Sequence, residues 1–113
     1  MTTLQNSGGR SIDLHGAFIV RTVLRGANLE RAILSGADCA GADFSHANLR
    51  EAVLTRARLV NASFRGANLD RAILDGADLR GADLSGVQNL TSAQVNSAIV
   101  DATTILPALD VRR

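Results

Sequence analysis

A five-residue repeat governs most of this chain. From Ile12 to Gly86 the sequence divides without a gap into 15 pentads, beginning with IDLHG and ending with ADLSG. Position one of the pentad is Ala in 13 of them, and position three is Leu in 11. One register kept over 75 residues constrains the fold more strongly than the overall composition does.

A period of five does not suit an α-helix. At about 100° per residue, successive leucines would be scattered around the helix and form no apolar stripe. In an extended segment, by contrast, positions one and three point to the same side, so each Ala-x-Leu unit makes one short inward-facing stretch. Position five is Gly in eight pentads, which is typical of a turn. The repeat therefore predicts short extended stretches joined by tight turns.

Longer self-similarity indicates how many pentads make one coil. Residues 25–44 match residues 65–84 at 15 of 20 positions, and Asn48 lies in line with Asn28 and Asn68. A 20-residue coil with four sides fits these offsets, and stacked coils place residue n over residue n+20 at about 4.8 Å. We number the sides one to four, starting with the pentad that begins at Ile12.

Stacking predicts an inner column of apolar side chains on every side. The predicted core consists of the position-three residues Leu14, Ile19, Leu24, Leu29, Leu34, Cys39, Phe44, Leu49, Leu54, Leu59, Phe64, Leu69, Leu74, Leu79 and Leu84. Small Ala at position one lets these larger residues meet at the axis. Because Cys39 occupies an inward position, we expect it to be a buried small hydrophobe and not a nucleophile.

The units ANLER, ADLRG and ADLSG resemble the A(D/N)LXX units of the pentapeptide-repeat family. This resemblance covers residues 12–86 and implies an all-β solenoid, a right-handed quadrilateral β-helix of about four coils. The ends of such a rod need caps. We expect residues 1–11 to be an N-terminal lead-in or cap, and residues 87–113 to form a C-terminal capping α-helix and tail.

The repeat register is lost after Gly86, where a helix start is predicted. Thr91 and Gln94 have the spacing of a capping box, and Leu90 and Val95 that of a hydrophobic staple. We expect a helix over residues 92–101 and an extended segment over 103–107. The apolar stripe of that helix would be Val95, Ala98, Ile99 and Ala102. It either folds over the last coil as a cap or meets a twin helix in a homodimer.

Charge and residue placement argue against several functions. Nine Arg balance nine Asp and Glu within residues 12–86, so direct binding of nucleic acid is not expected. No apolar run approaches the roughly 18 residues of a membrane span, and a cytoplasmic location is expected. His15 and His46 fall on different sides, and no Ser has a base placed to activate it. We therefore expect no enzyme activity, no metal site and no cofactor.

Side four carries charges of alternating sign. Its position-four residues are Glu30, Arg50 and Asp70, and its position-five residues are Arg31, Glu51 and Arg71. Asn28, Asn48 and Asn68 form its position-two column, and we expect this column to hydrogen-bond along the stack. The role expected for these columns is to fix the register between coils.

The outer column of side one departs from the repeat. Position two is Asp or Asn in eight pentads, but Ile33, Val53 and Ile73 occupy it on side one, and Phe18 adds apolar area on side two. One interpretation is that branched residues suit a strand. The other is a surface for a protein partner or a second copy, because contiguous exposed apolar residues are typical of interfaces.

Two functional hypotheses remain. The first is a non-enzymatic, rigid structural or protein–protein interaction module. The second is implied by the family resemblance alone: a DNA mimic that binds a type II topoisomerase such as gyrase. Duplex DNA carries one charge per roughly 1.7 Å of axis, so a mimic needs uncompensated acidic residues, and the balanced repeat does not supply them.

Overall fold

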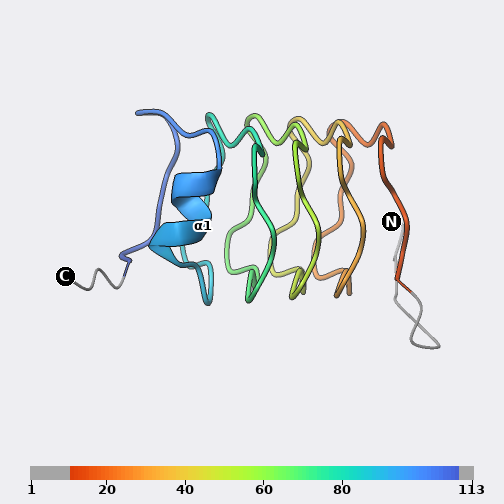
Figure 1. The fold of residues 1–113 in the computed structure, drawn as a ribbon, viewed down its shortest axis with the longest axis horizontal. Coiled ribbons are helices and arrows are strands. Elements are labelled where there is room, and N and C mark those ends of the chain that lie inside the picture. Colours follow the sequence, from red (N-terminus) through yellow and green to blue (C-terminus); the bar gives the residue numbers. More distant parts are fainter. Residues whose placement is uncertain (1–10, 110–113) are drawn as a thin grey trace.

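The computed structural model describes residues 11–109 as a stack of coils with one short helix, α1 (Ser92–Ser97), near the C-terminal end. Figure 1 shows the coils side by side along the long axis, with α1 beside the last of them. The predicted N-terminal lead-in over residues 1–11 lies outside the described residues, apart from Ser11.

Equivalent sides of successive coils are joined by parallel β-bridges. The bridged residues are 20 positions apart throughout the repeat, as the bridge between Ile33 and Val53 illustrates. The columns are Asp13, Ile33, Val53 and Ile73 on side one; Phe18, Asp38, Arg58, Asp78 and Ile99 on side two; Val23, Asp43, Ser63, Asp83 and Ile105 on side three; and Asn28, Asn48, Asn68 and Gln88 on side four. The chain turns after each bridge, so the sides stay too short for longer strands.

Backbone hydrogen bonds at positions two and three repeat in the same pattern from coil to coil. The position-three N–H donates to the position-two carbonyl of the next coil, as from Leu34 to Val53 over 2.8 Å. The position-two N–H donates to the position-one carbonyl of the previous coil, as from Val53 to Ala32 over 2.9 Å. In the middle of the stack, both backbone groups of position two, the N–H of position three and the carbonyl of position one are therefore paired between neighbouring coils.

The inner columns form one continuous apolar core. Thirteen of the 15 predicted core residues are buried, and the rings of Phe44 and Phe64 stack with their centroids 5.0 Å apart. The prediction of burial is wrong for Leu14 and Ile19, which are only partly buried. Both belong to the first coil, and no described residue stacks above them.

The turns depend on left-handed backbone conformations at position five. Eight of these residues are Gly, and the remaining seven have φ between 56° and 61°. A side chain at this position can lie over the next coil, which explains one of the glycines. A β-carbon added at Gly66 would lie 2.6 Å from Nδ1 of His46, so glycine leaves space for the imidazole.

Thr91 and Gln94 fix the start of helix α1. The Gln94 N–H donates to Thr91 Oγ1 over 3.2 Å, and the Thr91 N–H donates to Gln94 Oε1 over 2.8 Å. Gln94 Nε2 also donates to the carbonyls of Leu69 and Ala72, each over 2.9 Å. One side chain therefore caps the helix and pairs two carbonyls at the corner between sides four and one.

The predicted helix over residues 92–101 is too long. Helix α1 ends at Ser97, and Ile99 returns to the ladder through 2.8 Å bonds with Ala77 and Leu79. The predicted apolar stripe fails for the same reason, because Ile99 bridges Asp78 on side two and is 48% exposed, and Ala102 is also exposed. Pairing with an existing ladder outweighs the weak propensity of a short helix.

The segment after Ile99 continues the coil as well. Ile105 bridges Asp83 on side three, and the Thr104 hydroxyl donates to the carbonyl of Leu79 over 2.8 Å. The prediction of an extended segment over 103–107 is therefore incomplete, because Thr103 lies in a turn and Ile105 lies in the ladder. Helix α1 occupies the place where side one would continue.

Candidate interaction surface

The position-two Asp and Asn residues close the turns that follow them. All eight such residues in the repeat accept a hydrogen bond from the backbone N–H two residues later, over 2.9 to 3.3 Å. Asn68, for example, accepts from the Asp70 N–H over 3.0 Å. This local bond is the one that Asp and Asn side chains form readily in turns.

This finding corrects the predicted Asn ladder on side four. Within residues 11–109 no hydrogen bond joins the side chains of Asn28, Asn48 and Asn68 along the column. Their Oδ1 atoms are used by their own turns, and Asn68 gains one further bond from Nδ2 of Asn89 over 3.1 Å. The sequence feature that indicates these turn bonds is an Asp or Asn at position two, two residues before the N–H group whose hydrogen bond it accepts.

Side one lacks these turn bonds on three successive coils. Ile33 and Val53 are partly buried and Ile73 is 44% exposed, and their bridges place them in one outer column. Apolar side chains accept no hydrogen bond, so the turns after them are closed by the backbone alone. The structure therefore gathers Ile33, Val53 and Ile73 in a contiguous apolar strip, which we call the side-one strip.

Phe18 is not part of the side-one strip. It lies on side two, bridged to Asp38, and is 82% exposed. Val23 on side three is 49% exposed in the same coil. It was not among the candidates predicted from the sequence. The apolar candidates thus divide into a strip along side one and a separate pair at the N-terminal end of sides two and three.

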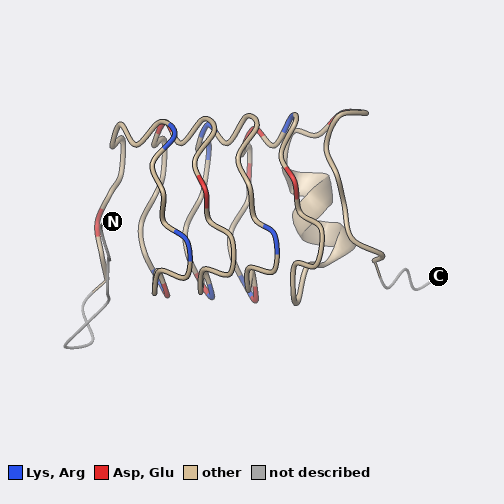
Figure 2. Cartoon of the chain, turned by 180° about the vertical axis from the view of Figure 1, so that it is seen from behind, with Lys and Arg blue, Asp and Glu red and all other residues tan. Residues whose placement is uncertain are grey.

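Side four is neutralised by a network of ion pairs. Arg50 pairs with Asp70 over 3.2 Å and with Glu30 over 3.1 Å, and Arg31 pairs with Glu51 over 3.2 Å. The hydrogen bond with the Asp70 side chain is the main cause of the raised pKa of Arg50. Figure 2 shows acidic and basic segments alternating along the coils, with neither sign gathered on one face.

Side two also carries charges in its middle, where Asp38, Arg58, Asp78 and Arg80 are paired. Arg80 contacts Asp78 over 2.6 Å, and Arg58 contacts Asp38 over 3.5 Å. The hydrogen bond from the Arg80 side chain is the main cause of the lowered pKa of Asp78. These contacts compensate both acidic residues of side two.

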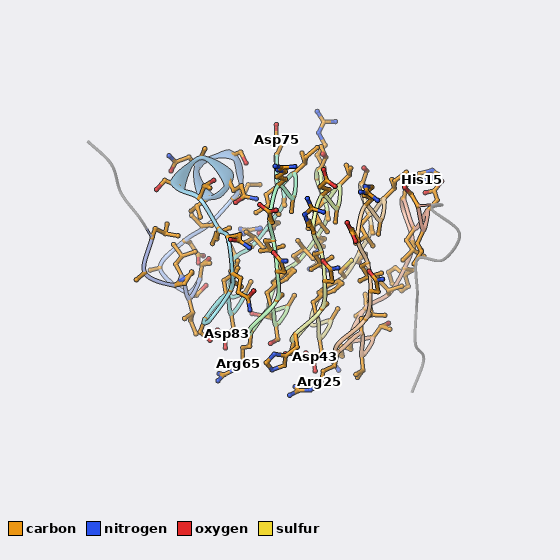
Figure 3. The ribbon with its side chains drawn as sticks, turned by 90° about the horizontal axis from the view of Figure 1, so that it is seen from below. His15, Arg25, Asp43, Arg65, Asp75 and Asp83 are labelled. Atoms are coloured by element: carbon orange, nitrogen blue, oxygen red, sulfur yellow. The ribbon has the colours of Figure 1, made fainter. Side chains whose placement is uncertain are left out.

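Side three carries a shallow hollow lined by His46, Arg65, Gly66, Ser85 and Gly86. Arg65 pairs with Asp83 over 3.4 Å, and Asp83 accepts the hydroxyl of Ser85 over 2.7 Å. The bond with Ser85 is the main cause of the lowered pKa of Asp83. In Figure 3, Arg25, Asp43, Arg65 and Asp83 lie along one edge of the rod, whereas His15 and Asp75 lie on the opposite edge.

The His15 and Cys39 side chains lie in surroundings that do not favour catalysis. Nδ1 of His15 lies 3.0 Å from Oδ1 of Asp13. Cys39 is fully buried, and burial raises the pKa of its thiol to about 12, so the nucleophilic thiolate is suppressed at neutral pH. In the part of the chain that the structure describes, no three His, Cys, Asp or Glu residues gather in a way that suits a metal ion.

Among residues 11–109 the structure has one helix, α1, with six residues. It is not long and apolar enough to cross a membrane.

The coil geometry and the repeat define the class of the protein. The family model of pentapeptide repeats, which contains eight copies, matches residues 12–50 and 47–86. The chain therefore belongs to the pentapeptide-repeat family, whose members form right-handed quadrilateral β-helices. A comparison with curated protein sequences found no match.

Solved structures of the same family resemble the chain. It is 31% identical to the pentapeptide repeat protein Rfr23 from the cyanobacterium Cyanothece 51142, with a TM-score of 0.77, and the match covers 83% of this chain. The chain spans 63% of the length of Rfr23. A pentapeptide repeat protein from the thylakoid lumen of Arabidopsis thaliana is also 31% identical, with 88% of this chain and 81% of that chain covered and a TM-score of 0.38.

Proposed function

We propose that this protein is a non-enzymatic interaction module that presents the side-one strip to a protein partner. Ile33, Val53 and Ile73 carry this proposal, because they replace the turn-closing Asp or Asn on three successive coils. On the other sides, position two either closes a turn, carries a charge or a hydroxyl, or lies at an end of the rod.

The replacement of Asp or Asn by Ile or Val at position two of side one is not explained by the stability of the fold. An intramolecular hydrogen bond contributes about 0.5 to 1.5 kcal/mol, and each apolar residue at position two forgoes one. The side chains of the strip stay partly in contact with water, so they recover less from burial than a core residue does. Three such exchanges in one column favour a role in contact with another molecule.

The geometry of the strip suits a flat apolar surface on a partner. Parallel bridges hold Ile33, Val53 and Ile73 in line, at about 4.8 Å between neighbours. Branched side chains have few rotamers, so little conformational entropy is lost when they are covered. A partner that offers an exposed apolar strand or helix face would match this strip without large rearrangement.

The DNA-mimic alternative receives less support from the charges. Six acidic residues of the repeat are paired with Arg, namely Glu30, Asp38, Glu51, Asp70, Asp78 and Asp83. Mimicry needs such charges to be uncompensated on one face. The gyrase alternative predicts a complex that weakens steeply with added salt.

A matched pair of triple variants tests the proposal. The strip variant carries Ile33→Asn, Val53→Asn and Ile73→Asn, which removes the apolar column and introduces the residue that closes turns elsewhere. The control carries Val23→Asn, Arg58→Asn and Ser63→Asn, which makes the same replacement at position two of sides two and three. Each is used as bait in native lysate at low and high salt, with retained proteins quantified by mass spectrometry.

The proposal predicts a protein that is retained by the wild type and the control at both salt concentrations and is lost from the strip variant. Retention of the same set by all three baits would contradict it. Gyrase retained by both variants at low salt and released at high salt would instead support the DNA-mimic alternative.

A further inference from the structure

The N-terminal edge of the rod exposes unpaired backbone groups. Among the described residues, the N–H and C=O groups of Phe18 and Val23 have no hydrogen-bond partner, whereas those of their counterparts Asp38 and Asp43 are bonded to the preceding coil. Leu14 and Ile19 lie at the same end of the core and are only partly buried. Edges of this kind are templates for further pairing.

The C-terminal edge is open in a complementary way. Within residues 11–109 the N–H groups of Val100 and Leu106 and the carbonyls of Ala98 and Thr104 have no partner. By the rule of the stack, these are the groups that would bind the position-two residues of a following coil. Among the described residues, the ladder therefore finishes with donors and acceptors in the same register that the N-terminal edge needs.

We propose that copies of this protein associate head to tail, with the C-terminal edge of one copy stacked on the N-terminal edge of the next. On side two, the N–H of Val100 would donate to the carbonyl of Phe18 in the second copy. The N–H of that Phe18 would donate to the carbonyl of Ala98. Val23 would continue side three after Ile105 in the same way. This inference concerns the ends of the rod and is independent of the function proposed for side one.

The outer residues at the two ends support this contact. Side two is charged in its middle, at Asp38, Arg58 and Asp78, but apolar at both ends, where Phe18 and Ile99 are 82% and 48% exposed. Side three follows the same pattern, with Val23 49% exposed at one end and Ile105 52% exposed at the other. Head-to-tail stacking would bring these exposed apolar residues together in their own columns.

The inner columns would continue across the same contact. Val100 follows the bridged Ile99, which puts it at position three of side two, in line with Ile19 and the buried Leu79. Val100 is 36% exposed and Ile19 is only partly buried, so each is an end of the core without a neighbour. Stacking would place one against the other and extend the apolar core through the junction.

Two end variants of the full chain test the proposal. Phe18→Pro removes the exposed ring and the donor at the N-terminal edge, and Val100→Pro removes the donor at the C-terminal edge. Neither N–H is used within the described part of the chain, so both variants should keep the circular dichroism of the wild type. Phe18→Asp and Ile99→Asp serve as a second pair, should either proline variant fail to fold.

Sedimentation velocity over a series of concentrations gives the readout. The wild type should show a mass that rises with concentration past that of a dimer, and each end variant alone should lose at least about tenfold in association constant. An equimolar mixture of the N-end and C-end variants should recover a 1:1 dimer, because each supplies the intact edge that the other lacks. Ile73→Asp, on side one, should leave association unchanged.

Several results would overturn the proposal. These are a wild type that stays monomeric at every accessible concentration, a closed dimer that survives the C-end variants, and loss of association through Ile73→Asp. Association that appears only after removal of residues 1–10 would also overturn it, because the N-terminal edge of the full chain would then be unavailable to a second copy.

Discussion

Sides one and four share an inside and differ outside. Both have an inner column of Leu residues, of which Leu49 and Leu54 are fully buried, and both are joined by parallel bridges at 20-residue spacing. Side four adds turn-closing Asn residues and a network of ion pairs, whereas side one has Ile and Val in the same outer positions. The comparison shows that the inner column and the backbone ladder are sufficient for the fold. The outer column is therefore free to vary and can serve contact with another molecule.

The largest expected effect concerns the inner columns. Leu49→Ala on side four and Leu54→Ala on side one should each lower the free energy of unfolding by about 2 to 5 kcal/mol, because both side chains are fully buried and leave a cavity. Equilibrium urea unfolding measures the two values. A difference between them well beyond experimental error would mean that the two sides also differ inside.

The corner between these sides should be the next most sensitive place. Gln94→Ala removes half of the capping box and the bonds to the carbonyls of Leu69 and Ala72, and should lower the free energy of unfolding by roughly 1 to 3 kcal/mol. Gln94→Glu is the matched control, since it keeps the acceptor for Thr91 and loses the donors. An unchanged midpoint for Gln94→Ala would show that α1 adds nothing to the last coil.

Making side four resemble side one tests the value of the turn bond. Asn68→Ile should lower the free energy of unfolding by about 0.5 to 1.5 kcal/mol, because the Asp70 N–H loses its acceptor. Asn68→Asp keeps an acceptor at the same place and should stay closer to the wild type. If Asn68→Ile were as stable as the wild type, the turn bond would have no measurable role.

The smallest effect is a difference in acid stability. Ser85 lowers the pKa of Asp83 and Ser45 lowers that of Asp43, in each case from 3.8. A carboxyl whose folded pKa is depressed stabilises the fold above its unfolded pKa, and this contribution is lost as the pH falls through the folded value. Ser85→Ala should therefore flatten the loss of stability below about pH 4.

Ser35→Ala provides the control for this titration. Ser35 follows Ile33 on side one, where position two has no carboxyl to titrate. The urea midpoint of Ser35→Ala should fall with acid as steeply as that of the wild type. Equal acid limbs for Ser85→Ala and Ser35→Ala would contradict the assignment of the lowered pKa to the turn of Asp83.

The sequence alone supplied the repeat register, the family and the inner columns. These follow from a strict period, because residues 20 positions apart stack in one column and every position-three side chain points to the axis. Phe44 and Phe64 illustrate the point, since their 20-residue offset predicted the stack that the structure shows. What a period determines can be predicted without coordinates.

Other features depended on competition between interactions and were predicted incorrectly. The Asn residues of side four were expected to bond along the stack, but each bonds its own turn, because that partner is two residues away. The helix was expected to reach Asp101, but Ile99 pairs with the ladder instead. Phe18 and Val23 form a separate apolar end because no described coil stacks on the first one, and the period of the repeat does not reveal this.

Equilibrium urea unfolding of the triple variant Ile33→Asn, Val53→Asn and Ile73→Asn tests the central claim most directly. If the side-one strip serves contact with another molecule, the free energy of unfolding of the triple variant should equal or exceed that of the wild type. Each introduced Asn can accept the hydrogen bond that closes its turn. A loss of several kcal/mol, or a chain that no longer folds, would show that the strip is needed by the fold itself, and the claim would be contradicted.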